Sequence, residues 1–190
     1  LVLVFYNFLL PVVFLLAFPG WVWKMKKRGG FGTGLLERLA LFKKPLTEER
    51  QGGIYVHAVS VGEVMIALKL IRKWIELDPE QHFILVPTTA TGHEVAREAA
   101  SKKIRVIYSP VDFWFTVNAV LDRFQPSQVV LIEAETWPNL VWVCEGRNIP
   151  VSVANTRLSP RSEKRFHQLQ FLVQPIFRMV SKFLVQESAD

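Results

Sequence analysis

Cysteine is almost missing from this sequence, in which Cys144 is the only example among 190 residues. A single cysteine excludes an intrachain disulfide and any cysteine-rich zinc site, and it fits a reducing compartment. Because Cys144 lies in the apolar segment 139–147, we expect a small buried side chain rather than a reactive thiol.

Charged side chains are missing from residues 1–23, and about 20 apolar residues suffice to cross the hydrocarbon layer of a membrane. Four basic residues follow directly: Lys24, Lys26, Lys27 and Arg28. A secretory signal has the reverse order, with its basic residues before the apolar run. By the positive-inside rule, we expect residues 1–28 to be an anchor at the cytoplasmic face of the plasma (inner) membrane.

Two prolines leave the path of this anchor open. Pro11 and Pro19 interrupt the apolar run, so the segment either spans the membrane or lies in its interface. In the second arrangement Trp21 and Trp23 would lie at the level of the lipid headgroups. A buried core helix is the third alternative, and we favour membrane association over it.

The remaining charge is moderately basic, with 23 Lys plus Arg against 17 Asp plus Glu and a net charge of +6. Such a surplus suits membrane lipid, phosphate or nucleic acid as a partner. The basic residues gather beside the apolar segment and the strand ends, not along one groove-sized face. We therefore expect no nucleic-acid partner.

From residue 54 onward, short apolar or β-branched runs alternate with segments of helical periodicity. This alternation is typical of βαβ units and a parallel sheet, so we predict an α/β fold with a Rossmann-like domain over 54–190. The near-continuous apolar strands indicate a sheet covered on both faces. Strands are expected at 54–59, 83–89, 104–109, 128–135, 150–155 and 182–186, and helices at 63–77, 92–102, 115–124, 139–147 and 163–169.

Residues 29–53 are expected to be a polar connector with a short helix at 35–42. Within it, GGFGTG at 29–34 resembles a dinucleotide-binding fingerprint. Its third glycine comes one place early and no strand precedes it, so we interpret the segment as a loop.

The first strand is followed by Ser60, Gly62 and Glu63, at the edge where open parallel sheets bind ligands. The spacing of Ser60 and Glu63 is that of a capping box, which needs no function beyond starting a helix. Gly62 would also let a ligand approach the backbone closely. A first-turn carboxylate is kept ionised by the helix dipole and can accept a proton, so both interpretations stay open.

The second strand is followed by TTATG at 88–92, which suits either a capped helix start or contacts to a polar ligand. His93, just beyond, is expected to face solvent. His57 lies inside the first strand, where we expect a hydrogen-bonded structural role.

The fourth strand is predicted to end in two carboxylates, Glu133 and Glu135, which would share one face because they are two residues apart. Carboxylates on a buried strand are costly unless they are paired or used. A salt bridge to an arginine is the structural alternative. We favour Glu135 as a site residue because it lies nearer the mouth of the strand.

The fifth strand is followed by a basic cluster that includes Arg157 and Arg161. A solvated helix face would explain the cluster, but its position beside acidic strand ends favours a phosphorylated substrate.

Three segments in this order and spacing, HAVSVGE, EAETWPN and ANTRLSPRS, resemble the 3-deoxy-D-manno-octulosonic acid (Kdo) transferases of lipopolysaccharide synthesis. The leading segment up to GLLERL is similar to the anchor and connector of that family. The resemblance implies a GT-B glycosyltransferase with two Rossmann-like domains, the first facing the lipid acceptor and the second binding CMP-Kdo. It implies an inverting transfer with CMP-Kdo as donor substrate and no cofactor or metal.

Carried over by position, the resemblance makes Glu63 the general base that deprotonates the 6′-hydroxyl of the lipid A precursor. Glu135 matches a second acidic residue of the acceptor site, Ser60 and Gly62 share the turn of Glu63, and Arg157 falls in an N-x-R segment. We add Arg161, from the same basic cluster, to the acceptor-binding residues.

Two departures accompany the resemblance. The ending QESAD differs from a Q-S-x-x-D type of ending, and the donor-binding domain is absent from these 190 residues. We therefore expect the first half of a longer enzyme, inactive alone. Another membrane-bound GT-B lipid glycosyltransferase with a different nucleotide sugar, or a non-catalytic module binding lipid or a partner, are the alternatives.

Overall fold

The centre of the structure, a computed structural model, is a parallel six-stranded sheet in the order β3-β2-β1-β4-β5-β6. Residues 2–28, 31–42, 51–133, 136–156 and 168–185 are described. The strands are β1 (Ile54–Ala58), β2 (Phe83–Pro87), β3 (Ile104–Val106), β4 (Gln128–Ile132), β5 (Val151–Thr156) and β6 (Lys182–Val185).

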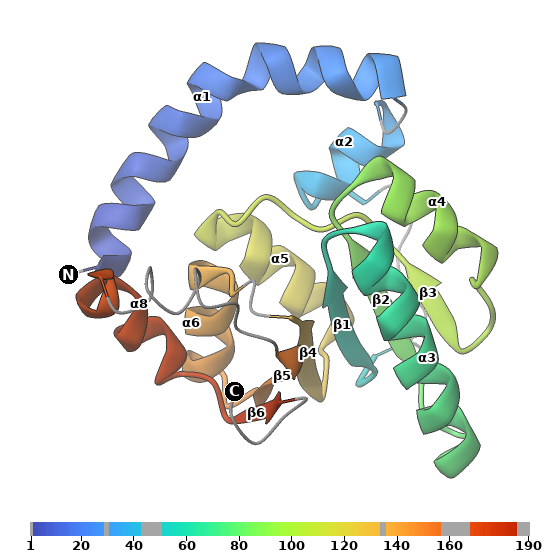
Figure 1. Cartoon of the computed structure of the whole chain (residues 1–190). Coiled ribbons are helices and arrows are strands. Elements are labelled where there is room, and N and C mark those ends of the chain that lie inside the picture. The colour runs from blue at the N-terminus through green and yellow to red at the C-terminus, as the bar shows by residue number, and fades with distance from the viewer. Residues whose placement is uncertain (1, 29–30, 43–50, 134–135, 157–167, 186–190) are drawn as a thin grey trace.

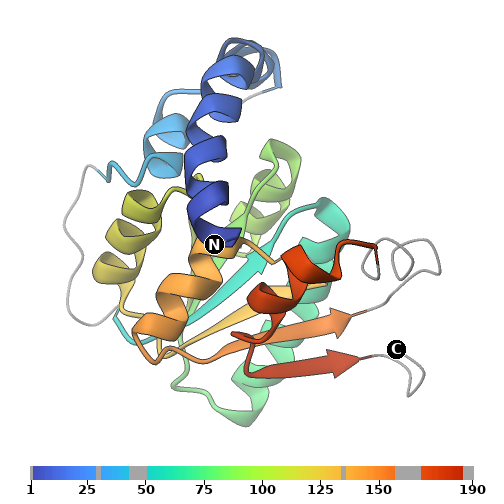
Figure 2. The same cartoon turned by 90° about the vertical axis from the view of Figure 1, so that its left-hand side faces the viewer.

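Helices cover both faces of this sheet (Figure 2). On one face lie α3 (Val61–Leu77) and α4 (Ala90–Glu98); on the other lie α5 (Trp114–Phe124), α6 (Pro138–Gly146) and α8 (Gln170–Phe177). Alternate strand residues serve the two cores: Val56 packs with the α3 and α4 side, and Tyr55 with the α5 and α6 side. Every residue of β1 and β2 is buried, which explains their continuous apolar sequences.

The direction of strand succession reverses between β1 and β4, which pair directly with Val56 opposite Val130. In doubly wound sheets, ligands bind at the carboxyl ends of the strands where this reversal occurs. The loops after β1 and β4 are therefore the topologically favoured place for a site.

The N-terminal helix α1 (Val2–Arg28) arches over the carboxyl ends of the strands (Figure 1). Pro11 and Pro19 lie inside it, and prolines are the usual cause of bends in long helices. By length and composition α1 could cross a membrane, and its most apolar window is not buried by the rest of the chain. The short helix α2 (Thr33–Arg38) follows.

Contacts along one side of α1 hold it to the rest of the structure. Asn7 and Asn139 exchange two side-chain hydrogen bonds of 2.8 Å, and the ring of Phe14 lies edge-on to Phe113 at 5.1 Å. The opposite side is exposed, with Leu16 reaching 80%. The helix thus has a docked face and an apolar outer face.

The predicted α/β fold with a preceding apolar helix is confirmed, and all six predicted strands are present, although β2, β3 and β4 end two or three residues earlier than expected. Cys144 is fully buried, and burial raises its pKa to about 12, as suits a structural thiol. Helix α8 was not predicted, and of the helix expected at 163–169 only residues 168 and 169 are described. The division of the chain at residues 28 and 53 stays a prediction.

Candidate functional site

The loop after β1 forms the predicted capping box at the start of α3. Ser60 Oγ accepts a hydrogen bond from the Glu63 amide at 3.3 Å, and Glu63 Oε1 accepts one from the Ser60 amide at 3.2 Å. Ser60 Oγ also donates to Oε1 at 2.8 Å, and the Val59 amide donates to Oε2 at 2.7 Å. These bonds fix the carboxylate of Glu63 above the end of β1.

The Glu63 side chain is only 5% exposed, yet its acceptor capacity is not exhausted. A carboxylate offers about four lone-pair positions. The described bonds use two on Oε1 and one on Oε2. One position on Oε2 is therefore free among the described contacts and can accept a proton from a ligand.

Gly62 is exposed between these two residues. A Cβ at this position would meet only Ser60 Oγ, at 3.8 Å, so packing within the described structure does not require glycine here. The open backbone surface is what close approach of a ligand would need.

Glu133 follows β4, the direct neighbour of β1, and is electrostatically coupled to Glu63. Burial and the negative charge of Glu63 together raise the pKa of the Glu133 carboxyl. Its amide donates to the carbonyl of Ala154 at 2.8 Å, while its φ of 62° lies in the left-handed region. The strand-order reversal thus brings two carboxylates together.

The expected extent of the fourth strand was wrong, because the strand was predicted to reach residue 135 but β4 ends at Ile132. Glu133 therefore lies in the turn after the strand, with a positive φ. Glu135 lies outside the described residues, so the expectation that the two carboxylates share one face stays a prediction.

Three of the predicted site residues, Glu135, Arg157 and Arg161, lie outside the described residues. Ser60, Gly62 and Glu63 are described and lie together. The acceptor-binding roles given to five of the six, and the catalytic role of Glu63, stay predictions.

His57 is 1% exposed and has the structural surroundings expected of it. Its Nε2 lies 3.2 Å from Ser109 Oγ and 3.3 Å from Thr88 Oγ1, and its ring is edge-on to Trp137. Burial lowers its pKa to about 4, so the ring is neutral at pH 7. A neutral ring can join the loops after β2 and β3 without placing a buried charge there.

A cavity of about 480 Å³ lies between α1 and the loops after β2, β3 and β4. Its apolar wall comes from α1, and its polar wall from α2 and the strand ends. The lining includes Leu10, Val13, Phe14, Ala17, Trp21, Lys24, Arg38, Thr88, Thr89, Ser109, Asp112 and Trp137.

This cavity adjoins the Glu63 loop through the backbone. The Thr89 amide donates to the carbonyl of Val59 at 3.1 Å, and the Val59 amide binds Glu63 Oε2. One peptide segment therefore connects the candidate base to the wall of the cavity.

Asp112 is 3% exposed and joins three elements at the edge of the cavity. Its Oδ1 accepts from the Leu140 amide at 3.0 Å, and its Oδ2 from the Asn139 amide and the Tyr6 hydroxyl, both at 2.9 Å. Burial raises the pKa of Asp112 to about 7, although the three hydrogen bonds lower it in part. Asp112 thus caps the start of α6 and holds α1 beside it.

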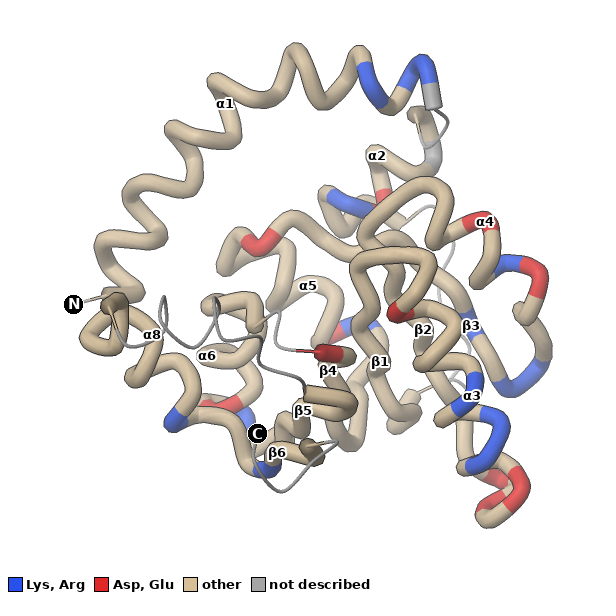
Figure 3. Tube along the Cα trace, viewed as in Figure 1, with Lys and Arg blue, Asp and Glu red and all other residues tan. Residues whose placement is uncertain are grey.

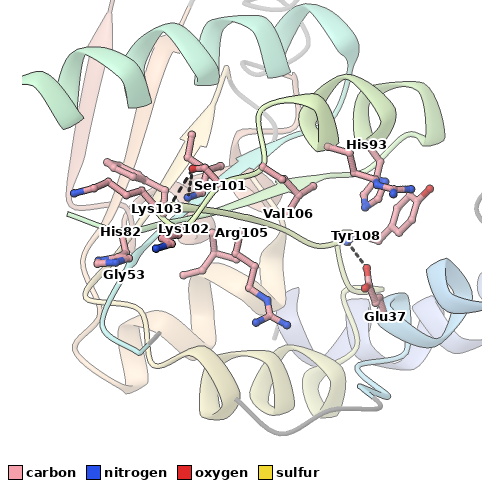
Figure 4. Close-up of a pocket in the computed structure, with 15 residues that line it drawn as sticks. Glu37, Gly53, His82, His93, Ser101, Lys102, Lys103, Arg105, Val106 and Tyr108 are labelled. Carbon is pink, nitrogen blue, oxygen red and sulfur yellow. Dashed lines mark hydrogen bonds between the residues drawn. The ribbon is translucent and has the colours of Figure 1, made fainter. Parts of the chain in front are cut away.

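A second cavity, of about 570 Å³, runs along the edge strand β3 (Figure 4). At one end Tyr108 stacks on His93 at 3.7 Å, and the Tyr108 amide donates to Glu37 at 3.0 Å. The expectation that His93 faces solvent was therefore wrong, since a half-buried ring covers Tyr108. None of Ser60, Gly62 and Glu63 lines this cavity.

The geometry can be compared with known proteins. A sequence profile of the family described as 3-deoxy-D-manno-octulosonic-acid transferase (kdotransferase) matches residues 33–190. This chain belongs to that family. A 3-deoxy-D-manno-octulosonic acid transferase of Haemophilus influenzae is 32% identical over 136 residues, 72% of this chain and 32% of the relative.

Two further relatives match almost the entire chain. A 3-deoxy-D-manno-octulosonic acid transferase of Chlamydia pneumoniae is 30% identical over 98% of this chain and 43% of its own length. A bifunctional glycosyltransferase/methyltransferase of Fusobacterium nucleatum is 33% identical over 97% of this chain and 28% of its own length. The chain thus spans less than half the length of these curated relatives.

In this member of the Kdo transferase family, the sequence did not single out Arg38 and Asp112, two buried charged residues that line the cavity beneath α1. Arg38 lies in the segment expected to be a connector. Its contacts are with Thr88, 50 positions away, and with Trp21 on α1. Asp112 had one local signal, a carboxylate in the apolar stretch IYSPVDFW, which resembles the stretch around Glu133.

Among the described residues, no three His, Cys, Asp or Glu side chains form a possible metal site.

Proposed function

We propose that this chain is the acceptor-side half of an inverting glycosyltransferase, which transfers Kdo from CMP-Kdo to the lipid A precursor lipid IVA in lipopolysaccharide biosynthesis. Membership of the Kdo transferase family supports the reaction class. The single observation that carries the assignment is the fixed carboxylate of Glu63 at the strand-order reversal, beneath an apolar helix.

In the proposed reaction Glu63 acts as general base. The acceptor hydroxyl gives its proton to Oε2, where a lone-pair position is free among the described bonds. The hydroxyl oxygen then forms a bond to the anomeric carbon of Kdo as the bond from that carbon to the CMP phosphate breaks. CMP leaves with the bonding electrons, and a single displacement inverts the configuration. Positioned bases of this kind contribute about 10²–10⁴-fold to rate.

The other predicted residues have proposed roles in holding the acceptor. Ser60 orients the Glu63 carboxylate directly, and Gly62 leaves room for the sugar beside it. Glu135 follows β4, which pairs with β1, and Arg157 and Arg161 follow β5, the next strand along the sheet. We propose that they bind the sugar and phosphate groups of the acceptor, and that the donor binds to a further domain outside these residues.

For the membrane, we propose that α1 lies in the interface at the cytoplasmic face of the inner membrane. Its contacts from Asn7 to Trp21 extend over about 21 Å at 1.5 Å per residue. A spanning helix would lose these contacts, because about 20 residues are needed inside the hydrocarbon. The basic residues appear only at the C-terminal end of α1, where anionic headgroups would meet them (Figure 3).

Glu63→Gln in the longest natural chain containing these residues tests the proposal. We expect turnover of CMP-Kdo and lipid IVA to fall at least about 100-fold, with folding and lipid binding unchanged. Glu76→Gln, on the exposed end of α3, is the matched control and should leave turnover intact. Normal turnover by Glu63→Gln would leave Glu63 only its capping role, and turnover with UDP-sugars instead of CMP-Kdo would support a different GT-B transferase.

A further inference from the structure

The cavity beneath α1 contains a guanidinium that no described carboxylate pairs with. Arg38 is 5% exposed and donates from Nη2 to the carbonyl of Thr88 at 2.7 Å. The rings of Trp21 and Tyr108 lie 5.6 and 4.3 Å from its Cζ. Its Nε has no hydrogen-bond acceptor in the described structure. Glu37, its neighbour in the chain, favours the charged guanidinium electrostatically but forms no described salt bridge with it, and burial lowers the pKa of Arg38. Because a buried cation is costly without a paired anion, the arrangement favours an anion that enters from outside.

A second donor at the same cavity is also without an acceptor. The indole Nε1 of Trp137 is buried and has no hydrogen-bond partner among the described residues. Lys24 adds a second cation to the lining. Two unpaired donors and two cations together suit a phosphate, which offers several acceptor oxygens and a charge of up to two.

Asp112, the only carboxylate among the described residues that line the cavity, does not balance these cations. Both oxygens of Asp112 are occupied by the Tyr6 hydroxyl and by the amides of Asn139 and Leu140. The part of the lining that α1 contributes is mostly hydrocarbon, including Leu10 and Val13. A cavity with a cationic wall and an apolar wall fits an amphiphile better than a free ion.

We propose that this cavity binds the phosphate monoester of a lipid, with the Arg38 guanidinium as the principal phosphate ligand and α1 covering the adjoining acyl chain. Lys24 and the Trp137 N–H complete the phosphate contacts. The inference deepens the proposed function, on which it rests for the identity of the lipid: it locates an acceptor phosphate one backbone segment from Glu63.

Binding can be measured without turnover, on the 190-residue chain in a neutral detergent. Calorimetric titration would use dioctanoyl phosphatidic acid, dioctanoyl phosphatidylcholine and inorganic phosphate. We expect the phosphatidic acid to bind at least tenfold more tightly than either of the other two, because only it carries both a phosphate monoester and acyl chains. Equal affinity for inorganic phosphate would contradict the amphiphile, and equal affinity for phosphatidylcholine would contradict phosphate recognition.

Arg38→Gln, with Arg72→Gln as the matched control, tests whether Arg38 makes the phosphate contact. Arg38→Gln should weaken phosphatidic acid binding about tenfold or more, the usual effect of losing a charge-assisted bond. Arg72→Gln removes the same charge from the exposed face of α3 and should change affinity less than twofold. An equal loss in both variants would indicate general charge attraction and overturn the inference.

Trp137→Phe keeps the proposal testable if Arg38→Gln does not fold, as circular dichroism would show. It removes the indole N–H, together with part of the ring, and should weaken binding several-fold; unchanged affinity would then overturn the inference. The two proposals fail separately. If the protein transfers Kdo but its Arg38→Gln variant binds phosphatidic acid normally, the phosphate site alone is contradicted. If binding depends on Arg38 but the protein transfers no Kdo, the proposed function alone is contradicted.

Discussion

The hydroxyl of Tyr6, near the start of α1, donates a hydrogen bond of 2.9 Å to Oδ2 of Asp112, 106 positions further along the chain. The same carboxylate oxygen accepts from the first turn of α6. Helix α1 and the loop after β3 are therefore linked through one buried carboxylate.

Removing this hydroxyl should loosen α1. Tyr6→Phe leaves Asp112 with one partner fewer, and we expect the free energy of unfolding to fall by about 1–2 kcal/mol in urea titrations. Phe5→Leu, on the exposed side of α1, is the control and should have no effect. Equal stability of the Tyr6→Phe and wild-type proteins would mean that the bond does not hold the helix.

Helix α2 should not tolerate a side chain at Gly34. A Cβ there would lie 2.8 Å from the ring of Tyr108, which stacks on His93 and covers Arg38. We expect Gly34→Ala to destabilise the fold by about 1–3 kcal/mol through overpacking. Gly20→Ala has no atom within 4 Å of its Cβ and should be neutral or stabilising in thermal unfolding.

His57 should make the fold sensitive to acid. Its pKa is about 4 in the folded state against 6.5 ordinarily, so the unfolded chain binds the extra proton first. The contribution of neutral His57 to the free energy of unfolding is therefore complete above pH 6.5. It is lost as the pH falls toward 4, by up to about 3 kcal/mol. His57→Gln should show a correspondingly smaller loss over this range in chemical unfolding. The pKa of His93 is also about 4, but His93 is present in both proteins, so the difference isolates His57.

Capping and catalysis can be separated at the start of α3. Ser60→Ala removes the acceptor of the Glu63 amide and should cost about 1 kcal/mol of stability, with a smaller loss of turnover than Glu63→Gln. Ser101→Ala is the control, because it removes a comparable side-chain acceptor, that of the Ile104 amide, away from Glu63 and from the cavity beneath α1. If Ser60→Ala and Ser101→Ala reduce turnover equally, the effect of Ser60 is on folding and not on the position of Glu63.

The path of α1 can be tested with cysteines, because the native Cys144 is fully buried. Val4→Cys should react with a membrane-impermeant maleimide only after the cells are opened, as should a cysteine placed at Lys102. Labelling of Val4→Cys in intact spheroplasts would show that α1 crosses the membrane.

The sheet could be predicted because its information is local. Each buried strand, such as β2, is a short apolar run, and the loops between strands begin with capping residues such as Ser60 and Thr89. The capping box was predicted from two residues three apart. The base role of Glu63 was predicted from the same turn and from the family resemblance, whereas the electrostatic effect of Glu63 on Glu133 depends on the strand order.

The wall of the phosphate cavity could not be predicted from sequence, because its partners are distant or belong to the backbone. Arg38 bonds to a carbonyl oxygen 50 positions away, and any residue type at Thr88 would supply that oxygen. Likewise, Asn7 in the apolar run shows no local sign that its amide pairs with Asn139. Helix α8 was missed because Pro175 lies inside it.

The docked face of α1 has a consequence for how a hydrophobic substrate would travel. If α1 lies in the interface as proposed, the strand ends are separated from the lipid by about one helix diameter, roughly 10 Å, and by the cavity beneath it. Under the proposed function, a glycolipid acceptor could then extend its sugar into the protein while most of its hydrocarbon stays in the bilayer. No carrier would have to extract it, and most of the hydrophobic cost of leaving the bilayer would be avoided.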